Sequence, residues 1–169
     1  MTRRDEPCSI EILTTSKELS PQAHLDDPKA TETYLEQLTE KIALCCDASA
    51  GPKSNRIIRH YCTPDIVTNL NGSGHLETSN VEDLIKAIET WRRINAAWRI
   101  GAFNFNATLD RRRENAICWF TSSGSGGPGE ADVWRTNQES VSKAFWRKRD
   151  SGAWECYRLT TIRGGGSWF

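Results

Sequence analysis

Apolar side chains recur at helical spacing in the first third of the chain. The dipeptide Asp27-Pro28 combines an acidic cap with a proline at the first helical position, which is typical of a helix start. The apolar positions that follow at helical spacing are Tyr34, Leu35, Leu38, Ile42, Cys45 and Cys46. This pattern predicts one long helix that ends before Gly51-Pro52, and a shorter helix over residues 54–61.

The next segment changes from helical spacing to alternation and back again. Residues 66–70 and 75–78 favour two short strands joined by a turn rich in Asn and Gly. The sequence SNVEDLIKAI that follows has the spacing of a capping box, with Ser79 as the cap and Glu82 reaching back to it. It predicts a third helix with a single apolar stripe.

The second half of the chain is rich in β-branched and aromatic residues. It predicts four long antiparallel strands, over residues 98–109, 116–122, 138–149 and 153–163. The stretch SSGSGGPGE is predicted to be a flexible excursion between two of them. The last two strands form a hairpin, with glycine at the left-handed position of the loop Asp150-Ser151-Gly152. This order indicates an α+β fold, with helices on one side of a curved sheet.

The final hairpin also predicts which side chains share each face of its sheet. Regular alternation from the loop pairs Phe145 with Tyr157 and places both with Leu159 on one face. The opposite face then carries Trp146, Trp154, Cys156 and Arg158. Because neither face is cleanly polar, we expect both faces to be covered at least in part.

The composition indicates one domain and limits the classes of partner. Residues 1–26 lack any pattern and are expected to form a flexible arm, whereas residues 27–169 suffice for a single domain. Basic and acidic residues balance at a net charge of zero, which argues against nucleic acid or an anionic membrane as a partner. No apolar run is long enough for a signal peptide or a membrane span, so we expect a cytoplasmic protein.

The six cysteines and three histidines show no spacing typical of a metal site or a redox motif. No CxxC motif occurs, and no cysteine and histidine form a zinc-binding cluster. Four of the cysteines lie in apolar segments, where a free thiol behaves as a small apolar side chain. We therefore expect reduced thiols, no bound metal and no cofactor.

The order of elements resembles the nuclear-transport-factor-2-like fold, which includes the SnoaL-like cyclases, the ketosteroid isomerases and the scytalone dehydratases. The resemblance covers roughly residues 30–169, and it depends on the run YCTPDIVTNLNG, the capped helix SNVEDLIKAI and the ending WRKRDSGAWECYRL. It implies a cone-shaped fold, in which a strongly bent, mostly antiparallel sheet wraps three helices around an apolar pocket. These similarities are of residue type and order, so they concern the fold more than the chemistry.

The resemblance also implies which side chains surround the pocket and a small apolar ligand in it. Phe145, Tyr157 and Leu159 would form the back wall, with Lys143 one step further along the strand. The other face of the sheet, with its exposed indoles, would meet a second copy in a homodimer. By analogy with scytalone dehydratase, the tail IRGGGSWF would bring Trp168 over the pocket as a lid; a frayed end is the alternative.

Enzymes of this family need a base, and this sequence departs from the known patterns. Asn69 stands where a ketosteroid isomerase carries its aspartate base, and an amide cannot act as one. Trp98 stands where scytalone dehydratase has its first strand histidine, and the second has no counterpart in AICWF. At these positions the resemblance implies that Asn69 and Trp98 contact the substrate without acting as bases. The remaining catalytic candidates are Asp47, His75 and, as a cation that would hold an oxyanion, Lys143.

Three functions remain open at this point. The first is a lyase, isomerase or cyclase that acts by acid–base chemistry on an apolar polyketide- or terpenoid-like substrate in fungal-type secondary metabolism. The second is binding of a small molecule without catalysis, which the missing histidines favour. The third is a protein-interaction module that uses the Trp-rich outer face. Asn104 is either a hydrogen-bond donor in the pocket or a residue of the exposed face.

Overall fold

The computed structural model describes residues 27–70, 76–125 and 138–163, and the predicted arm over 1–26 lies outside them. The elements in chain order are α1 (Pro28–Leu44), the short 3-10 helix η2 (Ala48–Ala50), α2 (Lys53–Tyr61), β1 (Cys62–Leu70), β2 (Leu76–Thr78), α3 (Val81–Ile94), β3 (Arg99–Leu109), β4 (Asn115–Ser125), β5 (Gln138–Lys148) and β6 (Trp154–Arg163). The predicted order of helices and strands is confirmed. The start of the stretch predicted to be a flexible excursion instead belongs to β4, which runs as far as Ser125.

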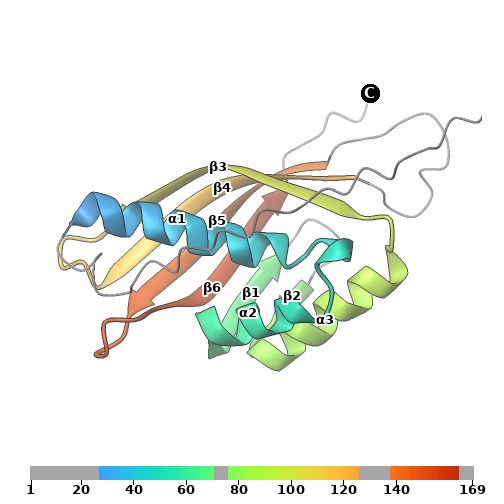
Figure 1. The fold of residues 1–169 in the computed structure, drawn as a ribbon, viewed down its shortest axis with the longest axis horizontal. Coiled ribbons are helices and arrows are strands. Elements are labelled where there is room, and N and C mark those ends of the chain that lie inside the picture. Colours follow the sequence, from blue (N-terminus) through green and yellow to red (C-terminus); the bar gives the residue numbers. More distant parts are fainter. Residues whose placement is uncertain (1–26, 71–75, 126–137, 164–169) are drawn as a thin grey trace, which may run out of the picture.

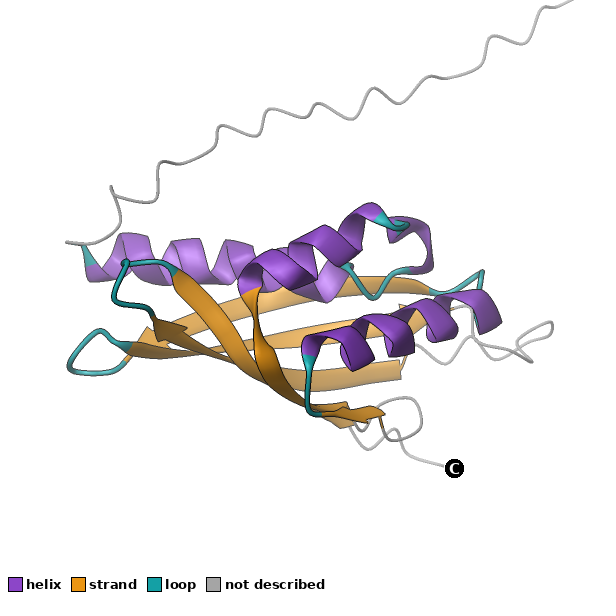
Figure 2. Cartoon of the chain, turned by 90° about the horizontal axis from the view of Figure 1, so that it is seen from below, coloured by secondary structure: helices purple, strands orange, loops and turns teal. Residues whose placement is uncertain are grey.

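The six strands form a mixed sheet in the order β2-β1-β6-β5-β4-β3. Neighbouring strands are antiparallel except for β1 and β6, which run parallel. The three helices lie on one face of a bent sheet, with α1 along β3 and α3 beside β1 (Figures 1 and 2). We call the face toward the helices the inner face and the opposite one the outer face. The predicted α+β class, with helices packed in a bent and mostly antiparallel sheet, is confirmed.

Side-chain caps set the starts of the long helices. Asp27 caps α1 as predicted, because its carboxylate accepts a backbone N–H of the first turn at 3.0 Å. The cap of α3 is Asn80 and not the predicted Ser79, since the Asn80 side chain accepts the Asp83 N–H at 2.8 Å. Glu82 does not reach back to a cap and instead pairs with an arginine of α2 at 2.8 Å.

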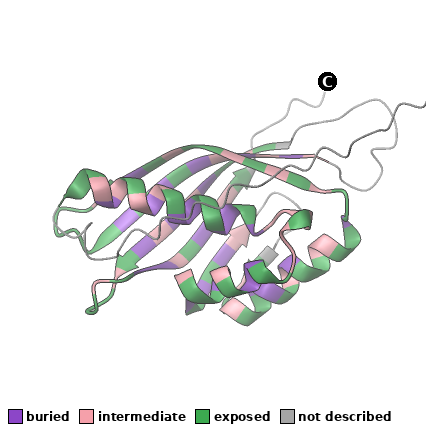
Figure 3. Ribbon diagram, viewed as in Figure 1, coloured by how far each residue is buried: buried purple, intermediate pink, exposed green. Residues whose placement is uncertain are grey.

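The hydrophobic core lies between α1, α2, α3 and the inner face. Buried and exposed positions alternate along the strands, as the stripes in Figure 3 show. Trp146 is fully buried, and its indole N–H donates to Oγ1 of Thr39 on α1 at 3.1 Å. This bond spares the buried indole the cost of an unpaired donor. Other members of the core are Leu35, Leu38, Ile58, Ile66, Leu84 and Cys156.

A β-bulge in the last hairpin interrupts the regular pairing of β5 and β6. The register pairs Trp146 with Cys156 and then passes over Tyr157, so that Phe145 lies opposite Arg158. An extra residue in one strand shifts its alternation of side chains by one position. The predicted pairing of Phe145 with Tyr157 is therefore wrong.

The bulge also overturns the predicted faces of this hairpin. Leu159 lies on the inner face with Trp146, Trp154 and Cys156, and all four are buried in the core. Phe145 falls between two fully buried inner residues of β5, so its side chain points to the outer face. Its ring packs against that of Tyr157 there, with centroids 6.2 Å apart. Trp146, Trp154 and Cys156, all predicted to face outward, are thus core residues.

A second bulge lies in β3 around Asn104. The register with β4 pairs Phe103 with Thr121 and then Asn106 with Trp119, which leaves two residues of β3 without a partner. Asn104 has a φ of 56°, in the left-handed region that asparagine tolerates better than most residues. Its side chain is exposed, so of the two alternatives for Asn104 the structure shows the exposed one.

Candidate functional site

A cavity of about 600 Å³ lies between the inner face of the sheet and the helices α1 and α3. Along β5 the inner positions Ala144 and Trp146 belong to the packed core, whereas Ser140 and Ser142 line the cavity. The inner face therefore has a core half and a cavity half. The walls of the cavity are mostly apolar and include Ile42, Leu70, Ile88, Trp91, Ile94, Trp98, Ile100, Phe120 and Leu159. A concave, mostly apolar site with a few polar groups is the usual form of a small-molecule site.

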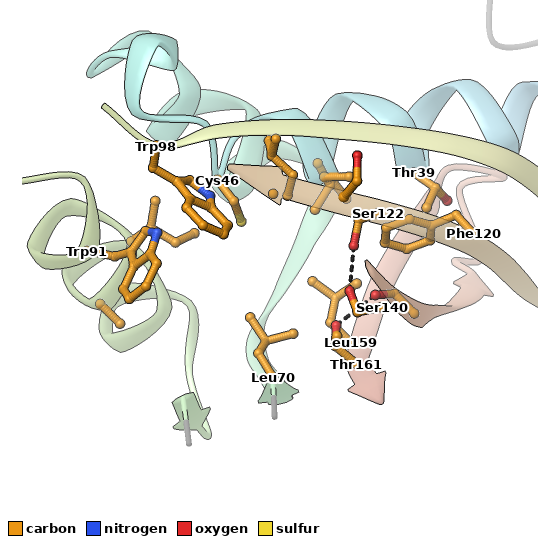
Figure 4. Close-up of a pocket in the computed structure, with 18 of the residues that line it drawn as sticks. Thr39, Cys46, Leu70, Trp91, Trp98, Phe120, Ser122, Ser140, Leu159 and Thr161 are labelled. Atoms are coloured by element: carbon orange, nitrogen blue, oxygen red, sulfur yellow. Dashed lines mark hydrogen bonds between the residues drawn. The ribbon is translucent and has the colours of Figure 1, made fainter. Parts of the chain in front are cut away.

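Two indoles form one side of the cavity. Trp91 of α3 and Trp98, just before β3, meet edge to face with ring centroids 5.5 Å apart and an interplanar angle of 85° (Figure 4). The Trp98 ring lies directly on Gly124 of β4, where a Cβ atom would stand only 2.0 Å from the indole. Glycine at this position is therefore what allows the indole to lie against the sheet.

Four hydroxyl groups on the inner faces of β4, β5 and β6 form the polar side of the cavity. Ser122 lies opposite Ser140 with 2.7 Å between their Oγ atoms, and Ser142 lies opposite Thr161 at 2.8 Å. Figure 4 shows Ser122, Ser140 and Thr161 facing the indoles across the cavity. Thr39 also lines the cavity, but its hydroxyl already donates to the Leu35 carbonyl at 2.8 Å.

The charged side chains of the lining are all exposed and lie at the rim. Asp83 and Lys86 of α3 are 3.6 Å apart, and Glu139 stands at the start of β5. Among the described residues that line the cavity there is no histidine. The described residues in the deep part of the cavity therefore include no carboxylate, ammonium or guanidinium group, and the charge there depends on the protonation state of the Cys46 thiol.

The Cys46 thiol lines the cavity in its neutral form. Burial raises the pKa of Cys46 to about 11, although the nearby Arg92 guanidinium acts in the opposite direction. Burial likewise raises the pKa of its neighbour Cys45 to about 12. Because the thiolate is the nucleophilic form, neither group is activated for attack at neutral pH.

Two of the predicted site residues lie in the cavity wall, namely Trp98 and Leu159. Asp47 lies outside it, where its carboxylate caps η2 and accepts backbone N–H groups of Ser49 at 2.7 Å and Ile100 at 2.8 Å. Partial burial opposes ionisation of Asp47, but the hydrogen bonds from Ser49 and Ile100 outweigh it and lower the pKa. A carboxylate held in this way is a weak base.

The other predicted site residues lie elsewhere. Lys143, Phe145 and Tyr157 are on the outer face, and the Lys143 ammonium sits 4.0 Å from the ring centroid of Trp119. Asn69 is outside the lining, and its amide donates to Glu77 on β2 at 3.1 Å. Asn104 is at the exposed bulge of β3. His75 and Trp168 lie outside the described residues.

The sequence analysis missed the serines and Thr161 of the cavity wall, and also Trp91 as a wall residue. Isolated serines in a strand are typical of an exposed face, so Ser140 and Ser142 carried no signal of their own. Ser140, Ser142, Ala144 and Trp146 are spaced two residues apart and therefore share one face of the strand. Assigning Trp146 to the core would have placed both serines on the inner face. That assignment failed because the bulge at Tyr157 was not foreseen.

Residues 27–70, 76–125 and 138–163 contain no group of three or more His, Cys, Asp or Glu side chains placed to hold a metal ion. No helix among these residues is both long and apolar enough to cross a membrane.

Comparisons with known proteins identify the fold. Neither family models nor curated protein sequences gave a match. Among solved structures, hexachlorocyclohexane dehydrochlorinase LinA-type3 from Novosphingobium barchaimii aligns with a TM-score of 0.61 at 13% identity, over 83% of this chain and 94% of that one. The chain has the nuclear-transport-factor-2-like fold. The predicted resemblance in fold is thus confirmed.

Two further structures show how varied the proteins with this nuclear-transport-factor-2-like fold are. A putative ketosteroid isomerase from Shewanella frigidimarina has a TM-score of 0.57 and 10% identity, over 82% of this chain and 97% of that one. The CaMKII hub from S. rosetta has a TM-score of 0.61 and 10% identity, over 79% of this chain and 96% of that one. Lyases and isomerases therefore occur in this fold beside proteins of other kinds, and identities this low show the fold alone.

Proposed function

We propose that this protein binds a small, uncharged and mostly apolar molecule in the cavity under its sheet, and that it acts as a carrier or sensor rather than as an enzyme. The observation that supports the proposal is the make-up of the lining. Apolar walls and two indoles face four hydroxyls, the thiol is neutral, and the charged side chains are confined to the rim. Such a lining favours burial of an apolar body and gives no counter-charge to a buried ion.

The proposal is tested by fluorescence titration with an apolar naphthalene dye and by mass spectrometry of compounds that co-purify with the protein. Ala87→Phe would fill the cavity from α3, and Arg93→Phe places the same side chain on an exposed part of the same helix. We expect Ala87→Phe to lower dye affinity at least tenfold and Arg93→Phe to leave it unchanged. Equal affinity in both variants and the parent protein would overturn the proposal.

The second candidate function is a lyase, isomerase or cyclase acting by acid–base chemistry on a polyketide- or terpenoid-like substrate. It is favoured by His75, which follows the wall residue Leu70 closely in the chain, and by the enzymes among the structural neighbours. Asp47 and Lys143 do not support it, because both lie outside the cavity.

Binding and catalysis separate in one experiment. The protein is incubated with a metabolite extract, and products are followed by mass spectrometry with wild-type protein, with His75→Ala and with heat-denatured protein. A carrier retains compounds without converting them, and His75→Ala retains them equally. Loss of water or isomerisation that requires His75 would establish the enzyme and overturn the carrier.

We also propose that two copies associate through the outer face, in a homodimer. Large apolar side chains are exposed there on adjacent strands, among them Trp119 (41% exposed), Val141 (42%) and Ile162 (61%). The register places Val141 opposite Ile162, so the apolar surface is continuous across β5 and β6. Val141→Asp is expected to yield a monomer in sedimentation, and a monomeric parent protein would contradict the dimer.

The cytoplasm is our proposed location. Cys45, Cys46, Cys62, Cys118 and Cys156 are free thiols, and reducing compartments keep cysteines in this state. Cys62 and Cys156 are direct partners on neighbouring strands, where an oxidising compartment would favour a cross-link. Mass spectrometry of the protein alkylated in freshly opened cells is expected to find both thiols reduced.

A further inference from the structure

Four of the hydroxyl groups that line the cavity are arranged as two pairs on three adjacent strands. Ser122 on β4 pairs with Ser140 on β5, and Ser142 on β5 pairs with Thr161 on β6. Ser122 and Ser142 are almost fully buried. The two pairs are displaced from each other by one strand and by two residues along the strand direction.

Each pair has one more donor than it uses. A hydroxyl carries one O–H donor, so two hydroxyls that bond each other spend one donor and keep the second. Within the described part of the chain, the side-chain hydroxyls of Ser122, Ser140, Ser142 and Thr161 have no hydrogen-bond partner beyond their own pair. Thr39 differs, because its donor is taken by the Leu35 carbonyl and its oxygen accepts the indole N–H of Trp146.

The surplus donors make the polar side of the cavity selective for acceptors. An O–H group that an apolar ligand buries without a partner costs roughly 1–3 kcal/mol, so a ligand without acceptors is disfavoured here. An anion would meet no cation beside these hydroxyls, because Lys86 stands at the rim next to Asp83. Neutral acceptor oxygens, such as carbonyl or ether groups, both accept the unpaired O–H donors and need no cation beside them.

We infer that the ligand is a neutral molecule with an apolar body and two acceptor oxygens, one for each hydroxyl pair. This inference rests on the proposed binding function and specifies its ligand class. Neighbouring strands and alternate residues place the two pairs roughly 7–8 Å apart, so the two oxygens of the ligand would have this separation. The apolar body would lie between the hydroxyls and the indoles of Trp91 and Trp98, which face them (Figure 4).

The test uses three probes of nearly equal size, in which an ether oxygen replaces a methylene group: 2,6-diethylnaphthalene, 2-ethyl-6-methoxynaphthalene and 2,6-dimethoxynaphthalene, whose two oxygens have the required separation of roughly 7–8 Å. Calorimetry or dye displacement would give their affinities. Each oxygen is expected to raise the affinity about three- to tenfold, the effect of one net hydrogen bond. Lys143→Ala, on the outer face between two inner residues, is the matched control and should leave the series unchanged.

Variants of the pairs give the decisive pattern. In Ser142→Ala the remaining Thr161 hydroxyl still has a free donor, so the preference for oxygen-bearing probes should persist. In Ser142→Ala/Thr161→Val that donor is gone, and the gain in affinity from one of the two probe oxygens should disappear. Ser122→Ala/Ser140→Ala should remove the gain from the other oxygen, and the combination of all four substitutions should flatten the series. Thermal unfolding of each variant would confirm that it is folded.

The possible failures are distinguishable. A flat series in the parent protein, or a series that survives in both pair-deleted variants, would overturn the inference about acceptor oxygens and leave cavity binding standing. If none of the three probes nor the naphthalene dye binds, both the inference and the proposed binding function are overturned.

Discussion

The two faces of β5 differ in a way that is unusual for a sheet with one covered face. Toward the helices the strand presents Trp146 in the core and then the hydroxyls of Ser142 and Ser140 in the cavity. Toward the outside it presents Val141 and Phe145, which are apolar and only partly covered. Hydroxyl groups thus lie at two inner positions of the strand, and two of its outer positions are apolar, with Lys143 between them. Both departures are explained if each face contacts another molecule: a ligand at the inner face and a second protein surface at the outer face.

The largest effect on the free energy of unfolding is expected from removing an indole of the inner face, compared with an indole of the outer face. Trp146→Ala deletes a fully buried ring with its hydrogen bond to Thr39, so we expect the free energy of unfolding to fall by about 3–5 kcal/mol. Trp119→Ala on the outer face should change the stability of the monomer by less than about 1 kcal/mol. Urea unfolding at low protein concentration measures both. Equal losses would show that the two faces do not differ in packing.

The next effect compares two glycines. Gly124→Ala places a methyl group in the space of the Trp98 ring, so we expect a loss of about 1–3 kcal/mol and a shift in tryptophan emission as the indole leaves the sheet. Gly101→Ala on β3 meets only the hydroxyl of Ser123, at 3.2 Å. Gly101→Ala should leave both the free energy of unfolding and the tryptophan emission nearly unchanged. An unchanged emission spectrum in Gly124→Ala would contradict this account of the cavity wall.

The cavity thiol predicts a dependence of stability on alkaline pH. The pKa of Cys46 is raised to about 11 from an ordinary value of 9.0, so the folded protein holds this proton more tightly than the unfolded chain. The contribution is complete below pH 9 and is lost as the pH rises toward 11, with a loss of at most about 3 kcal/mol. Cys46→Ala should reduce this slope. Rapid alkylation of Cys46 by iodoacetamide at neutral pH would contradict a buried neutral thiol.

The smallest effect is expected at the bulge that sets the faces of β3. The backbone of residue 104 has a φ of 56°, and alanine tolerates this left-handed region less well than asparagine. We therefore expect Asn104→Ala to lower the free energy of unfolding by about 1 kcal/mol. Asn104→Gly should restore or raise stability, whereas Asn106→Ala, also exposed but without a positive φ, should do little. Thermal unfolding of the three variants checks this order. A neutral Asn104→Ala would indicate that the conformation is not imposed at this residue.

Much of the fold was predictable, because the signals involved are local. The proline after Asp27 and the apolar spacing of α1 and α3 set the helices, and the loop at Gly152, with its φ of 84°, set the last hairpin. The cap of α3 was displaced by one residue, since both Ser79 and Asn80 can serve and the choice depends on the chain entering the helix.

The candidate site was less predictable, because it depends on which face each strand residue occupies. A single extra residue at Tyr157 placed Trp146, and not Phe145, on the inner face with Leu159, and nothing local in the sequence marks that bulge. The bulge at Asn104 has a local signal in the residue type, but asparagine is also common on exposed strand faces. The hydroxyl pairs arise only when three strands align, so no single segment contains them.

The division of the inner face into a core half and a cavity half has an evolutionary consequence. Trp146 and Cys156 belong to the core and do not line the cavity, whereas Ser142 and Thr161 line it and Leu159 belongs to both. Substitutions in the cavity half can therefore accumulate without bringing the chain to the threshold of unfolding. An architecture divided in this way leaves much of the sequence free to vary, and solved structures with this fold align with the chain at identities of only 10–13%.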